Sequence, residues 1–358
     1  MIKKPRGNFG RFLPLLRFRD WSFITGLIGM ARILVTGGAG YIGSHVCKEL
    51  SEHGFEAIAF DNLSTGHREL VKWGPLIQGD VCDREAIETA IRNVRPAAVL
   101  HFAASSLVGE SMANPGKYYR NNVGGSLTLL EAMVSAGVSR LVLSSTCATY
   151  GIAAQTPIGE RTVQNPINVY GDTKLAIERM IDAFETAHGL KSVCLRYFNA
   201  CGADPDGDTG ELHECEPHLI PRAIFSALGQ VSDFTIFGQD YPTPDGTPIR
   251  DYIHVTDLAA AHVSALIHLL CSEKPLKLNL GLGQGYSVGQ VIDAVRRVTK
   301  RDVPFKVDGR RAGDPAVLVA DCTRAREVLG FQPRFSALDT IIATAWNWHR
   351  RRHNASQV

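Results

Sequence analysis

Short apolar runs alternate with stretches of helical periodicity through the first half of this 358-residue chain. The runs lie at residues 32–36, 56–60, 98–102 and 140–146. Strands that are buried on both faces of a parallel sheet give such unbroken runs, and helices that cover a sheet give a period near 3.6 residues. The alternation therefore predicts an α/β fold built on a doubly wound parallel sheet.

Gly37, Gly40 and Gly43 follow the first run at the spacing of a nucleotide-binding turn. In such a turn the first glycine permits the tight bend, the second lets the backbone approach a pyrophosphate, and the third allows the helix to pack closely on the strand. Unpaired N–H groups at the helix N-terminus would hold the phosphates. Glycines at this spacing also occur in turns that bind nothing, so the motif needs support from its surroundings.

Asp61 gives that support, because it ends the second run at the position of a ribose-binding acid. An acid about 20 residues beyond such glycines accepts hydrogen bonds from the adenosine ribose, and its charge repels a 2′-phosphate. We therefore expect a Rossmann domain that binds NAD rather than NADP. The alternative is an Asp61-Asn62 turn held by a local hydrogen bond from side chain to backbone.

Polar or small residues also follow later strands, at the edge where a parallel sheet binds its ligands. Asp80 can meet the adenine amino group, or it can cap a helix that begins near Asp83. Ala103 and Ala104 leave room for a ligand beside the backbone. Thr146 places a hydroxyl at the same edge, although β-branched residues at strand ends are common without any ligand.

Tyr170 and Lys174 lie four residues apart in the next helical stretch, so they share one face of that helix. An ammonium beside a phenol favours the phenolate and lowers its pKa towards the range of a general base. The same lysine can reach the nicotinamide ribose. A lone pair of this kind usually marks a solvated helix face, but here it follows a nucleotide-binding pattern and a hydroxyl at a strand end.

Composition narrows the function classes. The chain is 45% hydrophobic and 21% charged, which is typical of a globular protein with a sizeable core and enough length for two lobes. A net charge of +2 gives no reason to expect a nucleic-acid partner. The eight cysteines show no paired CxxC spacing for zinc or a dithiol centre, so we expect a reduced, cytoplasmic protein.

The first 29 residues differ from the rest, because basic and aromatic residues alternate there with almost no acids. They are too interrupted to span a bilayer, and we expect no stable membrane insertion. A weak membrane-surface segment is one interpretation. We favour a disordered extension, or translation that begins at Met30 immediately before the first strand.

Together these motifs resemble the extended short-chain dehydrogenase/reductase superfamily. Within it, the chain closely resembles the UDP-glucose (UDP-galactose) 4-epimerase family from about Ala31 to Arg351. The resemblance rests on residues 36–43, Asp61-Asn62, Ser144-Ser145-Thr146, Tyr170 with Lys174, and residues 195–199. It continues through residues 202–205, 217–221, 236–238, 249–255 and 310–314, which are similar to substrate-lobe motifs of that family.

The resemblance implies a tightly bound NAD and a UDP-sugar substrate. It assigns cofactor contacts to Gly37, Gly40, Tyr41, Ile42, Gly43, Asp61, Asn62, Asp80, Val81, Phe102, Ala103, Ala104, Asn121, Ser144, Tyr170, Lys174 and Phe198. It assigns substrate contacts to Thr146, Tyr170, Asn199, His218, Leu219, Phe237, Arg250, Arg311 and Asp314. Two guanidinium groups near one pocket suit a diphosphate.

It also implies a division of the chain. Residues 30–198 form the NAD-binding Rossmann domain, and residues 199–351 form mainly a smaller mixed α/β lobe for the UDP-sugar, with some chain returning to the Rossmann domain. Residues 352–358 are a tail. Members of the family are commonly homodimers, here through helices near residues 115–136 and 169–188.

The implied activity is 4-epimerisation through a transient 4-keto sugar. Tyr170, as phenolate, removes the proton of the sugar 4-hydroxyl while a hydride passes from C4 to NAD. Thr146 forms a hydrogen bond with the same oxygen. Lys174 lowers the pKa of Tyr170 and positions the cofactor. The sugar then turns over and the hydride returns to its other face. We expect UDP-glucose and UDP-galactose as substrates.

Several alternatives stay open or are disfavoured. A related 4,6-dehydratase would carry Asp-Glu after the strand-end threonine, where this chain has Cys147 and Ala148, and the same missing acid argues against a UDP-glucuronate decarboxylase. A non-catalytic NAD-binding regulator can lose the Tyr and Lys that this chain retains. Ser106 stands where many members of the family have a lysine that contacts the cofactor phosphates. Leu318 falls where the family places a residue that gates room for an N-acetyl group, and its intermediate size leaves UDP-N-acetylglucosamine as an alternative substrate. UDP-arabinose and UDP-xylose also stay open as substrates.

The run from His213 to His218 holds several potential metal ligands. Its proline and its mixture of ligand types favour a lid or substrate loop, and we assign no metal to it.

Overall fold

A computed structural model describes residues 31–214, 216–311 and 314–355. The expectations for residues 1–29 and for the end of the tail lie outside these residues.

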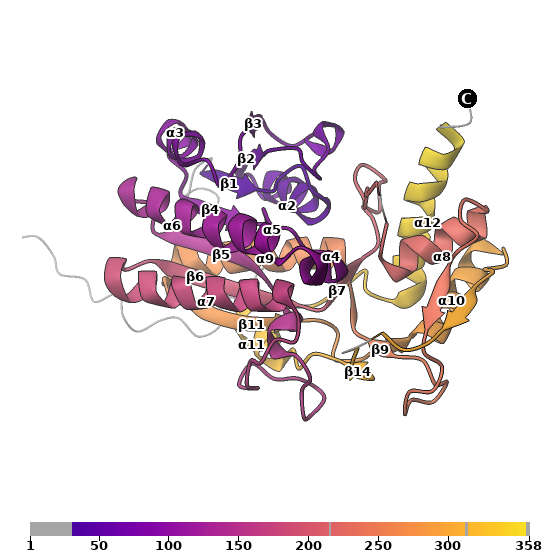
Figure 1. Cartoon of the computed structure of the whole chain (residues 1–358). Coiled ribbons are helices and arrows are strands. Elements are labelled where there is room, and N and C mark those ends of the chain that lie inside the picture. The colour runs from indigo at the N-terminus through magenta and orange to yellow at the C-terminus, as the bar shows by residue number, and fades with distance from the viewer. Residues whose placement is uncertain (1–30, 215, 312–313, 356–358) are drawn as a thin grey trace, which may run out of the picture.

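A seven-stranded parallel sheet forms the centre of the larger lobe, in the strand order β11-β6-β5-β4-β1-β2-β3 (Figure 1). Its strands are β1 (Arg32–Thr36), β2 (Glu56–Asp61), β3 (Leu76–Gln78), β4 (Ala98–His101), β5 (Arg140–Thr146), β6 (Lys191–Tyr197) and β11 (Leu276–Leu280). The order reverses direction between β1 and β4, as in a doubly wound sheet. The predicted fold class is confirmed.

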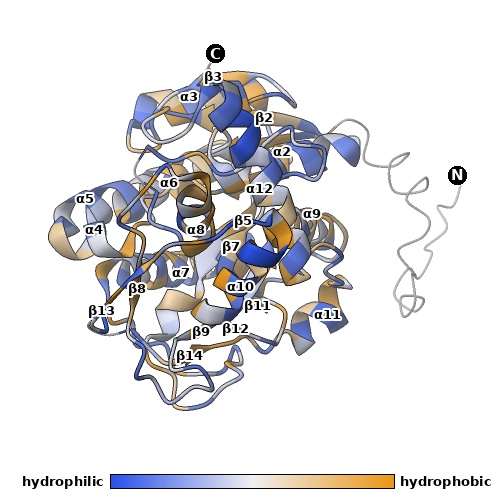
Figure 2. Ribbon diagram, turned by 90° about the vertical axis from the view of Figure 1, so that its right-hand side faces the viewer, coloured by the Kyte–Doolittle hydropathy of each residue, from blue (hydrophilic) through white to orange (hydrophobic). Residues whose placement is uncertain are grey.

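Helices cover both faces of this sheet. Their bounds are α2 (Tyr41–Glu52), α3 (Arg84–Val94), α4 (Val108–Ala113), α5 (Pro115–Tyr118), α6 (Gly125–Ser135), α7 (Val169–His188), α9 (Val255–Ser272) and α11 (Thr323–Leu329), with shorter turns at η1 (Arg68–Leu70), η2 (Tyr119–Gly124) and η3 (Cys147–Tyr150). Side chains alternate across β1, so Ile33 and Val35 pack with α2 and α9, whereas Leu34 packs with α3, α6 and α7. Figure 2 shows hydrophilic and hydrophobic segments side by side along α3, as expected for a helix with one buried face.

Helix α9 is long and apolar enough to cross a bilayer. Most of it is buried instead, and Leu258, Val263 and Leu266 pack in one cluster with α2 and the sheet. Its composition is therefore explained by its place in the core.

The smaller lobe is built around helices α8 (Leu219–Leu228), α10 (Val288–Thr299) and α12 (Leu338–Ala355), which group together at one side of the molecule in Figure 1. Its short strands are β7 (Asn199–Cys201), β8 (Thr235–Phe237), β9 (Ile249–Arg250), β10 (Tyr252–His254), β12 (Tyr286–Ser287), β13 (Lys306–Asp308) and β14 (Val317–Leu318). They pair as β10-β7, β12-β9-β14 and β13-β8. Between β10 and β12 the chain returns to the larger lobe, where it forms α9 and β11.

Candidate active site

The turn between β1 and α2 lets a ligand come close to the protein backbone but leaves no space for side chains on two of its glycines. Gly37 has a φ of +74°, and a Cβ there would lie 2.6 Å from the Ala103 nitrogen. A Cβ on Gly43 would lie 2.1 Å from the Gly37 carbonyl oxygen. Gly40 is the N-cap of α2 and supplies no capping side chain, so the first turn of that helix lacks a side-chain acceptor. These features fit the pyrophosphate of a dinucleotide.

Asp61 is buried at the end of β2, next to this turn. Its Oδ2 accepts a hydrogen bond from the Ala39 N–H at 3.0 Å, and its Oδ1 accepts one from the Leu63 N–H at 2.8 Å. Burial raises the pKa of this carboxyl, against the effect of the two N–H donors. The local turn bond considered from the sequence is therefore present, together with a contact to the glycine turn. A carboxylate has further lone pairs for ribose hydroxyls.

Asn62 and Asp80 lie side by side at the ends of neighbouring strands. The Asn62 amide donates to Asp80 Oδ2 at 2.8 Å. Asp80 does not cap α3, because the N-cap of that helix is Asp83, whose side chain accepts from the Ala86 N–H. The capping interpretation of Asp80 is wrong. Asp80 instead accepts from the Cys82 N–H at 2.8 Å, beside the buried Val81.

The loop after β4 folds back onto the glycine turn. The N–H groups of Phe102 and Ala103 both donate to the Thr36 carbonyl oxygen, at 2.9 and 3.1 Å. The Phe102 ring lies against His262 of α9, with centroids 4.8 Å apart. Half-buried Ala104 continues this loop, and half-buried Tyr41 and Ile42 begin the helix that faces it.

Asn122 is a residue that the sequence reasoning missed. It is fully buried, its Oδ1 accepts from the Ser105 N–H at 2.8 Å, and its Nδ2 donates to the Ser105 carbonyl and to Thr173 Oγ1. It therefore ties the loop after β4 to α7. The expected cofactor contact Asn121 is its neighbour in the π-helical segment η2 and donates to Asn122 Oδ1 at 3.0 Å. The Asn-Asn pair was the available signal, and only its first member was assigned.

Tyr170 and Lys174 lie on the buried face of α7, with exposed fractions of 9% and 2%. The helix begins there because Asn168 caps it, accepting from the Gly171 N–H at 2.8 Å. Thr146 ends β5, and its Oγ1 accepts from the Ala148 N–H at 3.1 Å. Lys174 Nζ donates to the Ser144 carbonyl oxygen at 2.7 Å, which anchors the ammonium to β5.

Burial is the main cause of the pKa shifts of Tyr170 and Lys174. It raises the pKa of Tyr170, and the neighbouring Tyr197 adds to that effect, while Thr146 acts in the opposite direction. Burial lowers the pKa of Lys174 to about 8. In the chain by itself, desolvation of the phenolate is the main cause of the raised pKa of Tyr170, and the effect of Lys174 expected from the sequence stays a prediction.

A buried ion pair between Arg196 and Glu178 links β6 to α7 beside these residues. Arg196 of β6 donates from Nε to Glu178 Oε1 at 2.9 Å, and Ser145 donates to the same oxygen at 2.6 Å. Glu178 follows Lys174 by one helical turn, a signal that the sequence analysis did not use. The Ser144 hydroxyl lies 2.6 Å from the Tyr197 hydroxyl, and Phe198 follows, buried, at the end of β6.

The predicted substrate residues come from several elements of the smaller lobe. Asn199 begins β7, and its N–H donates to the Asp251 carbonyl at 3.0 Å. His218 is the N-cap of α8 and Leu219 is its first residue. These three positions lie at the ends of elements rather than within them.

Four of the predicted substrate residues, Arg250, Asp314, Arg311 and Phe237, form two contacts. The Arg250 guanidinium forms an ion pair with Asp314. The Arg311 guanidinium lies over the Phe237 ring, 4.0 Å from its centroid. The structure thus pairs all four residues, two by two; the residues between Arg311 and Asp314 lie outside the described ranges.

Residues 33–281 match the model of the NAD dependent epimerase/dehydratase family. The chain belongs to that family. It is 50% identical over 321 residues to the UDP-glucose 4-epimerase of Rhizobium meliloti, which covers 90% of this chain and 98% of the relative.

Solved structures agree with this assignment. The UDP-glucose 4-epimerase of Brucella ovis, in complex with NAD, is 50% identical and superposes with a TM-score of 0.87 over 88% of this chain and 98% of its own. The enzyme of Stenotrophomonas maltophila, with bound NAD and formylated UDP-arabinopyranose, is 40% identical with a TM-score of 0.88, over 91% and 99% of the two chains.

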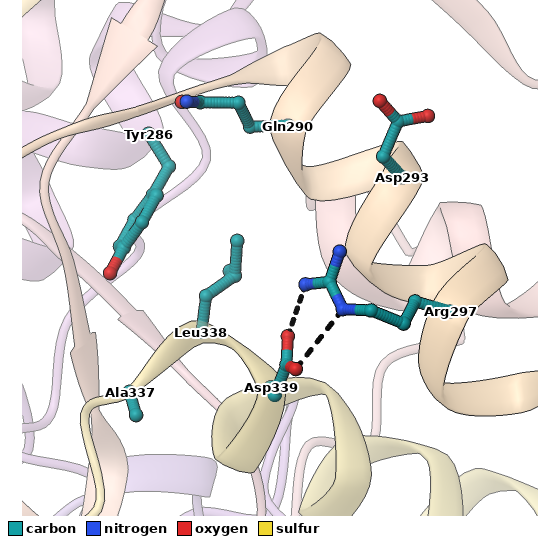
Figure 3. Close-up of a pocket in the computed structure, with 7 residues that line it drawn as sticks. All are labelled: Tyr286, Gln290, Asp293, Arg297, Ala337, Leu338 and Asp339. Carbon is teal, nitrogen blue, oxygen red and sulfur yellow. Dashed lines mark hydrogen bonds and ion pairs between the residues drawn. The ribbon is translucent and has the colours of Figure 1, made fainter.

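A separate surface pocket of about 510 Å³ lies between α10 and the start of α12 (Figure 3). Its lining residues are Tyr286, Gln290, Asp293, Arg297, Ala337, Leu338 and Asp339. Arg297 and Asp339 form an ion pair with each other there. None of the predicted site residues lines this pocket, so we assign it no part in the reaction.

Proposed function

We propose that this protein interconverts UDP-glucose and UDP-galactose by NAD-dependent 4-epimerisation. The observation that carries the proposal is the buried pairing of Tyr170 and Lys174 on one face of α7, alongside the Thr146 strand end. The 50% identity to a UDP-glucose 4-epimerase supports the choice of sugar.

In the proposed reaction, Tyr170 accepts the proton of the sugar 4-hydroxyl, and the Thr146 hydroxyl hydrogen-bonds the same oxygen. Lys174, held by the Ser144 carbonyl, places a cation beside the nicotinamide ribose. NAD, when bound, supplies the hydride acceptor and, in its oxidised form, a positive charge that favours the phenolate. The glycine turn, Asp61 and the Asn62-Asp80 pair would hold the cofactor.

The substrate is held mainly by its nucleotide. Arg250 and Arg311 supply the cations for its diphosphate, and both already have a partner that orients them, Asp314 and the Phe237 ring. A firm hold on UDP and a looser hold on the hexose allow the 4-keto sugar to turn over between the two hydride transfers.

Dehydration is disfavoured by the groups after Thr146. Cys147 is half-buried, and burial raises the pKa of its thiol to about 12, so it is a neutral group at physiological pH. Ala148 has no titratable group at all. A 4,6-elimination needs an acid and a base at these positions, and they are absent.

UDP-arabinose and UDP-xylose form the second candidate substrate class. One specific observation favours it: the Stenotrophomonas relative binds a formylated UDP-arabinopyranose. Leu318 lies opposite Arg250 in the β14-β9 pair, next to the Arg250–Asp314 contact, where its size can affect the room left for the sugar.

The test is an assay of purified protein without added NAD. UDP-galactose, UDP-arabinose, UDP-xylose and UDP-N-acetylglucosamine are supplied in parallel, and products are separated by chromatography. We expect UDP-galactose to be converted to UDP-glucose fastest. A faster pentose reaction would move the assignment to the second class, and accumulation of a dehydrated sugar would reject epimerisation.

We further propose a cytoplasmic homodimer and the lobe boundary near residue 198. The seven cysteines in the described ranges are free thiols, which suits a reducing compartment.

Tyr119 and Leu127, on η2 and α6, are exposed apolar residues near the expected dimer helices. Light scattering should give twice the mass of one chain, and Leu127→Asp should shift the mass towards the monomer; a monomeric wild type would reject the dimer.

A further inference from the structure

Four side chains of the loop before α8 converge on one point. Glu211, His213, Glu216 and His218 each offer one ligand atom, and these atoms all lie within 4.8 Å of one another. The sequence alone favoured a lid or substrate loop here. It could not show that the Glu-x-His-x-x-Glu-x-His spacing folds all four side chains to the same place.

Each histidine nitrogen lies between both carboxylates. His218 Nδ1 is 2.7 Å from Glu211 Oε1 and 2.8 Å from Glu216 Oε1. His213 Nδ1 is 3.4 Å from Glu211 Oε1 and 3.1 Å from Glu216 Oε2. A single N–H hydrogen can point well at only one acceptor. Both nitrogens are hydrogen-bonded to Glu216, and because each also faces Glu211 the four side chains are arranged around a common centre.

We propose that Glu211, His213, Glu216 and His218 form a binding site for a divalent transition-metal ion, with Zn²⁺ as its natural occupant. Zn²⁺ takes four nitrogen and oxygen ligands in a tetrahedron at about 2.0–2.2 Å, which places neighbouring ligand atoms about 3.3–3.6 Å apart. Of the nitrogen–oxygen separations of 2.7, 2.8, 3.1 and 3.4 Å, the last lies in that range and the other three are shorter, as expected for ligands hydrogen-bonded to each other without the ion. A small outward movement of the side chains would complete the shell.

Burial and access both suit a metal. The Glu211 and Glu216 side chains are 4% and 3% exposed, so two carboxylates lie together away from water, where positive charge beside them is required, supplied by the histidines or by a metal ion. The His218 and His213 side chains are 48% and 26% exposed, which leaves a route from solvent to the centre.

The site would join three parts of the molecule. The Trp348 indole of α12 donates to the Glu211 carbonyl at 2.8 Å, and His67, which follows β2, lies 3.0 Å from the Leu212 carbonyl oxygen. His218 is also the N-cap of α8. A metal here would fix the loop that sets the start of α8, where His218 and Leu219 are expected to meet the UDP-sugar.

Another acidic cluster among the described residues, formed by Asp204, Asp206 and Asp208, does not have this character. Lys48 Nζ lies 2.9 Å from Asp204, 2.8 Å from Asp206 and 3.3 Å from Asp208, so an ammonium already stands where a cation would bind. It provides a matched control.

The experiment uses the full chain without a histidine tag, produced in zinc-supplemented medium and purified without chelators. Metal content is measured by mass spectrometry. The metal is then stripped, and Zn²⁺ or Co²⁺ is titrated back. We expect close to one Zn²⁺ per chain, the visible absorption of tetrahedral Co²⁺ in the reloaded protein, and a rise of a few degrees in Tm when Zn²⁺ is added.

Variants identify the ligands. Glu216→Gln and His213→Gln should each lose the metal and the Zn²⁺-dependent rise in Tm, whereas Asp206→Asn should keep both. Wild-type protein that holds no metal and shows no tetrahedral Co²⁺ absorption overturns the proposal, and the wild-type spectrum decides even if a variant fails to fold. Equal metal content in Glu216→Gln and wild type also overturns it. These readouts do not depend on epimerase activity.

Discussion

The proposed base, Tyr170, is harder to ionise in the chain alone than its sequence position implies. Its spacing from Lys174 correctly places both on one buried face of α7. What the spacing could not show is that Lys174 donates to the Ser144 carbonyl, or that burial raises the pKa of Tyr170. Both effects depend on residues outside α7, such as Ser144 of β5 and Tyr197 of β6, so they belong to the folded molecule rather than to the motif.

Tyr170→Phe tests this residue. Loss of the proposed general base should lower kcat by about 10²- to 10⁴-fold, while the circular dichroism spectrum and the amount of NAD that copurifies stay unchanged. Tyr118→Phe is the matched control, because it removes another hydroxyl of a buried tyrosine, one that donates to the Leu107 carbonyl at 2.7 Å. Equal losses of activity in the two variants would remove Tyr170 from its proposed role.

At the scale of elements, the central strands could be predicted and the small sheets could not. Unbroken apolar runs mark β1, β2, β4 and β5 because both faces of each strand are covered. The strand β13 is three exposed residues, and it exists because it pairs with β8, about 70 positions earlier in the chain. No local pattern encodes such a pairing. The π-helical η2 is equally invisible in the sequence, although it carries Asn121 and Asn122.

Gly43→Ala tests the contact between α2 and the glycine turn. A Cβ there would lie 2.1 Å from the Gly37 carbonyl oxygen, so the turn must shift. We expect a loss of about 1–3 kcal/mol in unfolding free energy and a marked drop in NAD content, measured by denaturant titration and by ultraviolet absorbance of the released cofactor. Gly109→Ala is the control, since a Cβ there meets nothing within 4 Å. Normal NAD content in Gly43→Ala would contradict the assignment of the turn.

At the scale of the whole molecule, several histidines are buried as neutral groups. Burial lowers the pKa of His45, His254 and His262 to about 4 and that of His101 to about 3. In the unfolded chain these groups take up protons below a pH of about 6.5. Between pH 6.5 and 4 the unfolded state therefore binds more protons than the folded state, and stability falls as the pH falls through that window.

His262→Leu tests this linkage. The thermal stability of the wild type should drop as the pH is lowered from 6.5 to 4, and the variant should show a flatter slope, by at most about 1.4 kcal/mol per pH unit. His262 Nε2 is a buried atom without a hydrogen-bond partner in the described structure, and Nδ1 lies 2.9 Å from the Leu258 carbonyl oxygen, a contact that the variant loses at every pH. The exposed His188→Leu is the control for removing an imidazole from the surface instead of from the core. A slope unaltered by His262→Leu would mean that this histidine does not stay neutral on folding.

In the two-lobe arrangement, too, local sequence patterns do not show which distant segments pair with each other. The resemblance implied that the chain returns to the Rossmann domain after residue 199, and the structure places α9 and β11 there. The patterns of those segments alone could not say which sheet β11 joins. The position of the lobe boundary stays a prediction.

The central claim is that the hydrogen on C4 of the sugar leaves and returns as a hydride within one protein molecule. UDP-galactose labelled with deuterium at C4 is converted in ordinary water, and the UDP-glucose formed is analysed by NMR and mass spectrometry. The account predicts that the label remains at C4 of the product. Replacement of the label by solvent hydrogen would indicate removal of that hydrogen as a proton, and would contradict the proposed mechanism.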